Sequence, residues 1–595
     1  MPPPPARPVI LDVAPDPVFA MYHAPASGAV SGTAVLVCPT WGWDDVASYR
    51  SRRAWADRLA ADGHPTLRID LPGAGDSGGS PGDEDRLGAW TRAVSAAAGW
   101  LAGQPGVSRV AAIGLGLGGL VAARAIADGA PVDDLVLWGA PVQGRAFLRE
   151  QRAFAGLQSS ALGLTQEQIA AGLPEGWLEV GGFVLSADTM AALQAIDLTA
   201  LPTGRLQRAL LLDRDGIRHD RAFEEHLRQQ GVVVSTAPGN GWTEMVFHPE
   251  RYAPAVATFD RVAAWLDEAI PASVAMDGAD PAASSDGLEL IQAGVRIRET
   301  AIRIEQPFGQ IFGVLAEPVD GPRSDLCAIF LNAGAVRRIG PNRMWVEASR
   351  RWSARGVPMI RMDLEGIGDA DGDPDRYRDV GNFYTAEFGA QVGAIIDDLE
   401  RRGFGPRFVL VGLCAGGYWA FHTGASDGRI VAALIINPRA MIWDPDLLSR
   451  REARKVQRLL EPALWTRIAR GEVGASRMVS VSRAVAGRAA GAVVGAPARL
   501  RHRGSGEPAA DAVVRLFDAL SSLGTRVVLA FSSDEPVYDE LAADGILARL
   551  DQWPNVVLQQ LPGHDHTLRP MIAQQALHRL LDAEFERLVS APADR

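Results

Sequence analysis

The chain has 595 residues, a net charge of −12, 47% hydrophobic residues and 22% charged residues. This length and balance predict two or three globular domains. The acidic charge argues against nucleic acid as the main partner. No apolar run is long enough for a transmembrane segment, and three cysteines are too few for a disulfide framework. The proline-rich residues 1–8 do not have the pattern of a signal peptide, so we expect a cytoplasmic protein.

The sequence contains one long internal repeat, with a period of roughly 295 residues. Four landmarks recur in the same order, which disfavours the alternative of a single large domain. The matched segments are 34–42 with 327–334, 67–76 with 360–369, 110–119 with 408–417, and 238–243 with 562–567.

Strand-like apolar runs alternate with helical stretches in each half, as in 527–531 followed by 538–550. Such alternation predicts βαβ units and a mainly parallel sheet. Residues 276–287 lie in a stretch rich in Ala, Ser, Asp and Pro, which is typical of a linker. We therefore expect an α/β protein with one domain at 1–275 and a second at 288–595.

Gly412-Leu-Cys-Ala-Gly416 lies between a predicted strand and a predicted helix. Glycines on both sides of Cys414 suit a sharp turn that lifts the central side chain above the sheet, and a helix N-terminus favours a thiolate there. On these residues, both halves resemble the α/β-hydrolase superfamily, with Cys414 in the place usually held by Ser. The resemblance implies two tandem α/β-hydrolase domains, each a mainly parallel sheet flanked by helices with an inserted helical cap.

The same resemblance implies a catalytic acid and a histidine downstream of the nucleophile, in that order. His566 follows the strand-like run 556–561 in a loop similar to the family's G-x-D-H pattern, and His564 is the competing choice. The acid should follow 527–531. The repeat aligns 212–215 with 531–534 and favours Asp534, whereas Glu535 is the alternative because it precedes a proline, as the family's acid often does.

Backbone N–H groups are expected to form the oxyanion hole, from Ala415 and from either Gly334 or Ala335. Three arginines follow in the same loop and could bind a carboxylate or phosphate of the substrate; they are Arg337, Arg338 and Arg343. Alternatively, they could pair with nearby acidic residues such as Glu347 or Asp363, or face solvent.

The first half has lost this machinery. Gly116 stands at the nucleophile position and Trp242 at the histidine position, and neither side chain can attack or accept a proton. Asp215 remains at the acid position, where we expect a structural hydrogen-bond acceptor. His248 cannot replace the base usefully without a nucleophile. We expect this domain to pack on the second as an intramolecular pseudo-dimer; it could instead bind substrate or a carrier protein, or hold a ligand.

The predicted chemistry is acyl transfer from an ester, thioester or lactone through a Cys-His-Asp triad, as in a thioesterase, cyclase or acyltransferase. The acyl group could be carried on an acyl or peptidyl carrier protein or on CoA. The arginine-rich cap expected at about 441–523 could dock such a carrier, or be a solvated helical face. No metal-ligand spacing or phosphate loop indicates a cofactor. The G-x-G-x-x-G at 114–119 matches a dinucleotide fingerprint, but the repeat explains the same glycines. The competing class is a non-catalytic scaffold built on two repurposed folds.

Overall fold

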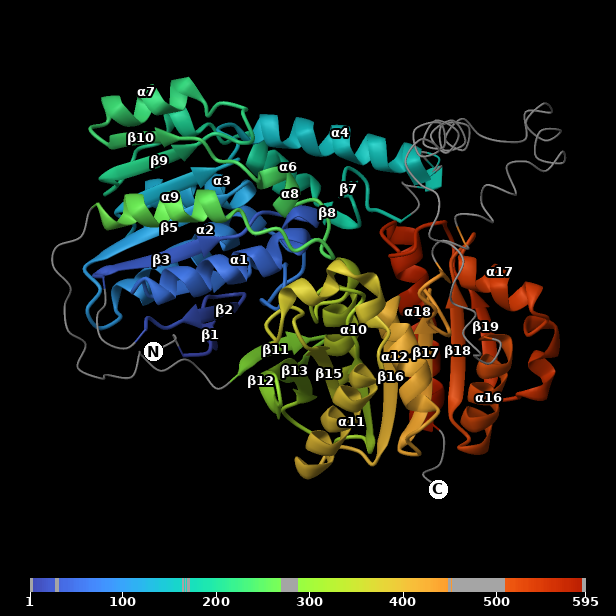
Figure 1. The fold of residues 1–595 in the computed structure, drawn as a ribbon. Coiled ribbons are helices and arrows are strands. Elements are labelled where there is room, and N and C mark those ends of the chain that lie inside the picture. Colours follow the sequence, from blue (N-terminus) through green and yellow to red (C-terminus); the bar gives the residue numbers. More distant parts are fainter. Residues whose placement is uncertain are drawn as a thin grey trace, which may run out of the picture.

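The computed structural model describes residues 4–26, 31–162, 165, 167–168, 172–268, 287–447, 451 and 509–590. It contains one large sheet in each half of the chain, and the two halves lie side by side (Figure 1). Nearly all of the predicted linker 276–287 and most of the predicted cap 441–523 lie outside the described residues.

The first sheet has eight strands, of which the last six in spatial order run parallel. Their spatial order is β1 (Arg7–Leu11), β2 (Val18–His23), β4 (Thr66–Ile69), β3 (Thr33–Cys38), β5 (Arg109–Leu115), β6 (Asp134–Trp138), β9 (Arg208–Leu212) and β10 (Val233–Ala237). A small hairpin, β7 (Leu178–Val180) and β8 (Phe183–Leu185), stands apart from it.

The second sheet repeats this order and adds one antiparallel strand at its edge. Its strands are β11 (Leu288–Gln292), β12 (Val295–Gln306), β13 (Gly309–Pro318), β15 (Met359–Asp363), β14 (Leu326–Phe330), β16 (Arg407–Leu413), β17 (Ile430–Ile436), β18 (Arg526–Phe531) and β19 (Val556–Gln560). The predicted fold class, with mainly parallel sheets flanked by helices, is confirmed.

Helices connect the parallel strands and cover both faces of each sheet (Figure 1). In the first half they are α1 (Trp43–Ala61), α2 (Arg86–Ala102), α3 (Leu117–Ala127), α4 (Gly144–Leu162), α6 (Ala187–Gln194), α7 (Arg221–Gln229), α8 (Trp242–Met245) and α9 (Val256–Asp267). In the second half they are α10 (Met344–Ser353), α11 (Ala386–Arg401), α12 (Ala415–Gly424), α16 (Ala509–Ser522), α17 (Pro536–Ala543) and α18 (Met571–Ser590). Short 3-10 turns are η1 (Leu198–Ala200), η2 (Pro341–Arg343), η3 (Pro374–Arg378), η4 (Val380–Phe383) and η5 (Leu547–Gln552).

Each sheet has an apolar core on both of its faces. The inner strands are buried on both sides, which is why they read as continuous apolar runs in the sequence. A smaller apolar cluster joins the halves, where Phe19 and Met21 of β2 pack with Phe312 and Val314 of β13. Among the described residues, no helix combines the length and the apolar character needed to cross a membrane.

Buried ion pairs also join the halves, and equivalent residues of the repeat make them reciprocally. Arg68 of β4 binds Asp369 at 2.8 Å, while Arg361 of β15 binds Asp76 at 3.1 Å. Burial alone raises the pKa of Asp369, but Arg68 and Arg338 outweigh it and hold that pKa well below its ordinary value. The reciprocity is that of an isologous dimer interface, here within one chain.

Candidate active site

Cys414 occupies a tight turn between β16 and α12. Its backbone has φ 59° and ψ −118°, a positive φ that costs strain for a residue with a side chain. A Cβ on Gly412 would lie 2.1 Å from the backbone of Gly416, and one on Gly416 would lie 2.4 Å from the carbonyl oxygen of Asn332. Glycine is therefore required on both sides, and Cys414 stands at the N-terminus of α12 as the sequence predicts.

His566 is hydrogen-bonded to Glu535, not to Asp534. The His566 Nδ1 atom lies 3.0 and 3.1 Å from the two carboxylate oxygens of Glu535, whose side chain is 5% exposed. Asp534 lies 3.0 Å from Nδ1 of His564 instead, and that pair is exposed to solvent. The sequence-based choice of Asp534 as the acid that holds His566 is thus wrong, and the alternative Glu535 takes its place.

The repeat alignment that favoured Asp534 is one residue out of register, and the corrected register points to neither acid. In both halves the backbone N–H at the turn, of Gly116 or Cys414, donates to the carbonyl of the last residue of the next strand. That last residue is in turn paired with a residue of the strand that precedes the acid. The pairs are Trp138↔Leu212 and Ile436↔Ala530. Three residues further on, Asp215 corresponds to Ser533 rather than to Asp534. Consistently, the N–H groups of Asp215 and Ser533 donate to the glycine carbonyls of the two Pro-Gly turns.

His566 and Cys414 are in contact, and the contact changes the charge state of the ring. Burial lowers the pKa of His566, but the charge of Cys414, a hydrogen bond to it, and the carboxylate of Glu535 together raise this pKa to about 10. The loop is held in place because the Asn437 side-chain amide donates to the carbonyl of His566 at 2.9 Å. A protonated imidazole is therefore favoured at neutral pH.

The predicted oxyanion donors lie around the same turn. Ala415 is the first residue of α12, and Gly334 and Ala335 form the turn directly after β14, next to Asn332 whose carbonyl touches the start of α12. Within the described parts of the chain, the backbone N–H groups of Gly334, Ala335 and Ala415 donate to no protein acceptor. They are thus available to a substrate oxygen.

Tyr384 also belongs to the site, although no sequence motif singled it out. It forms a hydrogen bond with Cys414, and burial together with the charge of Cys414 raises the pKa of Tyr384 well above its ordinary value. Its ring stacks on Trp443 with centroids 4.3 Å apart and meets Tyr418 edge-on at 5.0 Å. A fixed phenol O–H therefore faces the sulfur.

The three arginines after the oxyanion loop do not line the site. Arg337 binds Asp70 at 2.8 Å, and Arg338 binds Asp76 at 2.8 Å together with acids of its own half. Arg343 donates to backbone carbonyls in the first half, at Gly75, Ser77 and Gly79. All three side chains are buried between the halves. The prediction that they bind substrate is wrong. The alternative of pairing with a nearby acid is confirmed for Arg338 and Asp363. The main partners of Arg337 and Arg343 lie in the other half of the chain, where sequence proximity cannot show them.

The corresponding turn of the first half has a similar backbone conformation, with a glycine where the second half has Cys414. Gly116 has φ 50° and ψ −124°, close to the values of Cys414. A Cβ added there would lie 2.7 Å from Oγ1 of Thr40 and 3.5 Å from the indole of Trp242, which is buried against it. Asp215 accepts hydrogen bonds from the backbone of Gly241 and Thr243 at 2.6 and 2.7 Å, at the start of α8. Its role is structural, as expected.

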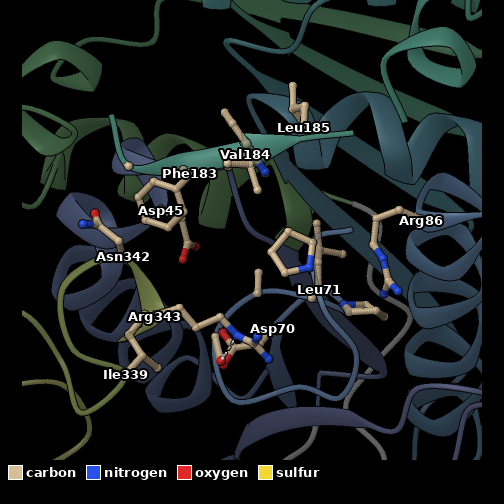
Figure 2. Close-up of a pocket in the computed structure, with 18 of the residues that line it drawn as sticks. Asp45, Asp70, Leu71, Arg86, Phe183, Val184, Leu185, Ile339, Asn342 and Arg343 are labelled. Atoms are coloured by element: carbon tan, nitrogen blue, oxygen red, sulfur yellow. Dashed lines mark hydrogen bonds between the residues drawn. The ribbon is translucent and has the colours of Figure 1, made fainter. Parts of the chain in front are cut away.

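A pocket with about 890 Å³ of empty space, including its open mouth, is lined in part by Thr40, the neighbour of Gly116. Figure 2 shows residues of both halves around it. The hairpin residues Phe183 and Leu185 form one wall, and Asp45 and Asp70 border it from the first half. The second half adds Arg343 and the adjacent loop. None of its lining residues belongs to the Cys414 site.

The model of the alpha/beta hydrolase family matches residues 328–583, so the second half has the α/β-hydrolase fold. No curated protein sequence matches the chain. Among solved structures, the chain is similar to Est1E from Butyrivibrio proteoclasticus with bound ferulic acid, at 17% identity over 44% of this chain and 98% of that one, with a TM-score of 0.31. It is also similar to a lidless serine hydrolase from Xanthomonas campestris, at 14% identity over 49% and 96%, with a TM-score of 0.29. A proline iminopeptidase from Mycobacterium smegmatis aligns at 17% identity over 49% and 100%, with a TM-score of 0.28.

Proposed function

We propose that the protein is an acyl-transfer hydrolase that cleaves an ester or thioester through Cys414, His566 and Glu535. The observation that carries this proposal is the ring of His566, which contacts Cys414 on one side and is held by the buried carboxylate of Glu535 on the other. A nucleophile, a base and an orienting acid in one line are what covalent acyl transfer requires.

In the first step the thiolate of Cys414 attacks the carbonyl carbon, and the carbonyl electron pair moves onto oxygen. The N–H groups of Ala415 and of Gly334 or Ala335 hold this oxyanion. When the tetrahedral intermediate collapses, the C–O or C–S bond of the substrate breaks, and the leaving alkoxide or thiolate takes the proton from His566. The acyl group remains on Cys414 as a thioester.

In the second step His566 removes a proton from water, an alcohol or an amine, which attacks the thioester carbonyl. The sulfur of Cys414 then leaves as a thiolate, and the ring returns to its protonated state. Glu535 fixes the tautomer and stabilises the imidazolium throughout. The hydroxyl of Tyr384, fixed by its stacking on Trp443, contributes by orienting the sulfur.

The proposal assigns all of this chemistry to the second half. In the first half, Gly116 offers no nucleophile, and the indole of Trp242 fills the space beside it. One active and one degenerate domain in tandem then explain why the turns at Gly116 and Cys414 share a backbone conformation but differ in their side chains. The reciprocal ion pairs between Arg68 and Asp369 and between Arg361 and Asp76 make that tandem an intramolecular pseudo-dimer.

The test is turnover of a panel of acyl-pantetheine thioesters and simple esters by wild-type protein. Cys414→Ala should abolish turnover, whereas Cys38→Ala, which removes a buried cysteine of the first half, should retain it. Activity that survives Cys414→Ala with the same substrates would overturn the assignment. Absence of turnover and of acyl labelling with every donor would favour a scaffold.

A further inference from the structure

One segment of the first half reaches the site of the second. Oxygen Oε1 of Glu250 lies 3.0 Å from the point where a Cβ on Gly334 would stand, so its carboxylate rests on the oxyanion loop. The same oxygen lies 3.6 Å from Nη1 of Arg439, which follows β17. A residue of the degenerate first half therefore lies against the oxyanion loop of the Cys414 site.

The position of Glu250 is fixed from both halves. Arg50 of α1 donates to the carbonyl of Pro249 at 2.6 Å and to the carbonyl of Pro374 in the second half at 2.8 Å. The Arg50 guanidinium also lies over the ring of Tyr252, 5.5 Å from its centroid. Within the segment, the N–H of Glu250 donates to Nδ1 of His248 at 3.2 Å. These contacts hold the segment that carries Glu250 against the second half.

The carboxylate of Glu250 keeps its hydrogen-bonding capacity. Its side chain is 22% exposed, and the 3.6 Å separation from Arg439 is too long for a hydrogen bond. No other described residue donates to its oxygens. The charges of Cys414, Arg439 and Glu250 all act on the hydroxyl of Tyr384, so these groups lie in one neighbourhood.

We propose that Glu250 is a specificity-determining residue that the first half supplies to the active site, where it binds a protonated amine on the acyl substrate. A partly exposed carboxylate with free lone pairs, beside the oxyanion loop, matches an ammonium group in charge and in hydrogen bonding. Arg439 lies 3.6 Å away, so it partly balances the charge of Glu250 without donating a hydrogen bond to it. The degenerate half is then retained because the active site is incomplete without it. The amine specificity rests on the proposed acyl transfer at Cys414.

The local charge can be measured without any turnover, using two methanethiosulfonate reagents of opposite charge. The 2-aminoethyl and 2-sulfonatoethyl reagents each form a disulfide with the sulfur of Cys414, and methanesulfinate leaves with the electron pair. Both modification rates are followed by intact mass, and the modification is mapped to Cys414. The ratio of the two rates reports the electrostatic potential at the sulfur. Glu250→Gln should lower the cation-to-anion ratio by about threefold or more, because a unit negative charge beside the oxyanion loop is removed.

Two variants control this measurement. Arg439→Gln should raise the ratio, and Glu244→Gln, an exposed carboxylate in α8, should leave it unchanged. A ratio that does not move in Glu250→Gln, or that moves equally in Glu244→Gln, overturns the placement of Glu250 at the site.

The specificity is then tested with a series of ω-aminoacyl esters, each matched with the alkanoyl ester that has a methyl group in place of the ammonium. Glu250→Gln should raise KM for the amine-bearing member of the best pair by about tenfold, with kcat and the matched alkanoyl ester little changed. An equal loss on both members overturns amine recognition. If wild-type protein turns over neither member, the proposed function fails, whereas the reagent ratio still decides where Glu250 acts.

Discussion

Replacing Glu535 by Gln should separate the two candidate acids. The change keeps the size of the side chain but removes the charge that lies 3.0 and 3.1 Å from Nδ1 of His566. Hydrogen bonds to charged groups contribute about 1.5–3 kcal/mol, and Glu535 is buried, so solvent does not screen the loss. If the interaction is made fully in the transition state, kcat/KM falls by about 10- to 150-fold.

The matched control is Asp534→Asn. Its partner is His564, both side chains are more than half exposed, and pairs of this kind contribute about 0–1 kcal/mol. Activity should change by less than about fivefold. The assay is kcat/KM for the best ester or thioester, with circular dichroism to check folding. Loss of activity in Asp534→Asn but not in Glu535→Gln would refute the assignment of the acid.

Three further predictions concern the ring, the interface and the first elbow. Burial lowers the pKa of His566, but Cys414 and Glu535 raise it to about 10. An NMR titration should therefore show the imidazolium losing its proton only as pH rises through about 10. Cys414→Ser should lower that midpoint. Arg338→Met leaves three buried carboxylates without a shared partner and should lower the free energy of unfolding by about 3–5 kcal/mol in denaturant melts. Arg296→Met, which breaks an exposed pair, should change it by less than about 1 kcal/mol. Gly116→Cys in a Cys414→Ala background should not restore turnover, because a Cβ there meets a threonine hydroxyl at 2.7 Å and an indole fills the site of the histidine.

Each of these has a contradicting result. A His566 midpoint near that of a free imidazole would contradict a ring held protonated by Cys414 and Glu535. Equal destabilisation by the two arginine variants would show that burial at the interface does not govern stability. Turnover in the Gly116→Cys double variant would mean that the first half retains a working base.

The sequence was most informative where local geometry leaves few choices. The turn around Cys414 requires glycines on both sides, and the alternation of strands and helices determines a mainly parallel sheet, so the elbow, the fold class and the histidine could be predicted. The acid could not, because Asp534 and Glu535 are adjacent. A one-residue slip in the repeat alignment, visible only in strand register, favoured the wrong one.

Contacts between distant segments were beyond sequence reasoning. Arg337 and Arg338 stand next to the oxyanion loop in the chain, but they bind acids of the first half that are far away in sequence. Tyr384 and Glu250 enter the site from a loop and from the other half, without a motif of their own. Their roles follow from how the two sheets pack, which the spacing of residues in either half does not encode.

The central claim is that one sulfur becomes acylated. Wild-type protein mixed with an acyl-thioester donor and quenched in acid should gain the mass of one acyl group, on the peptide that contains Cys414, and hydroxylamine should remove it as expected for a thioester. Acyl mass on a different residue, or an unmodified Cys414 peptide under conditions of active turnover, would contradict the account.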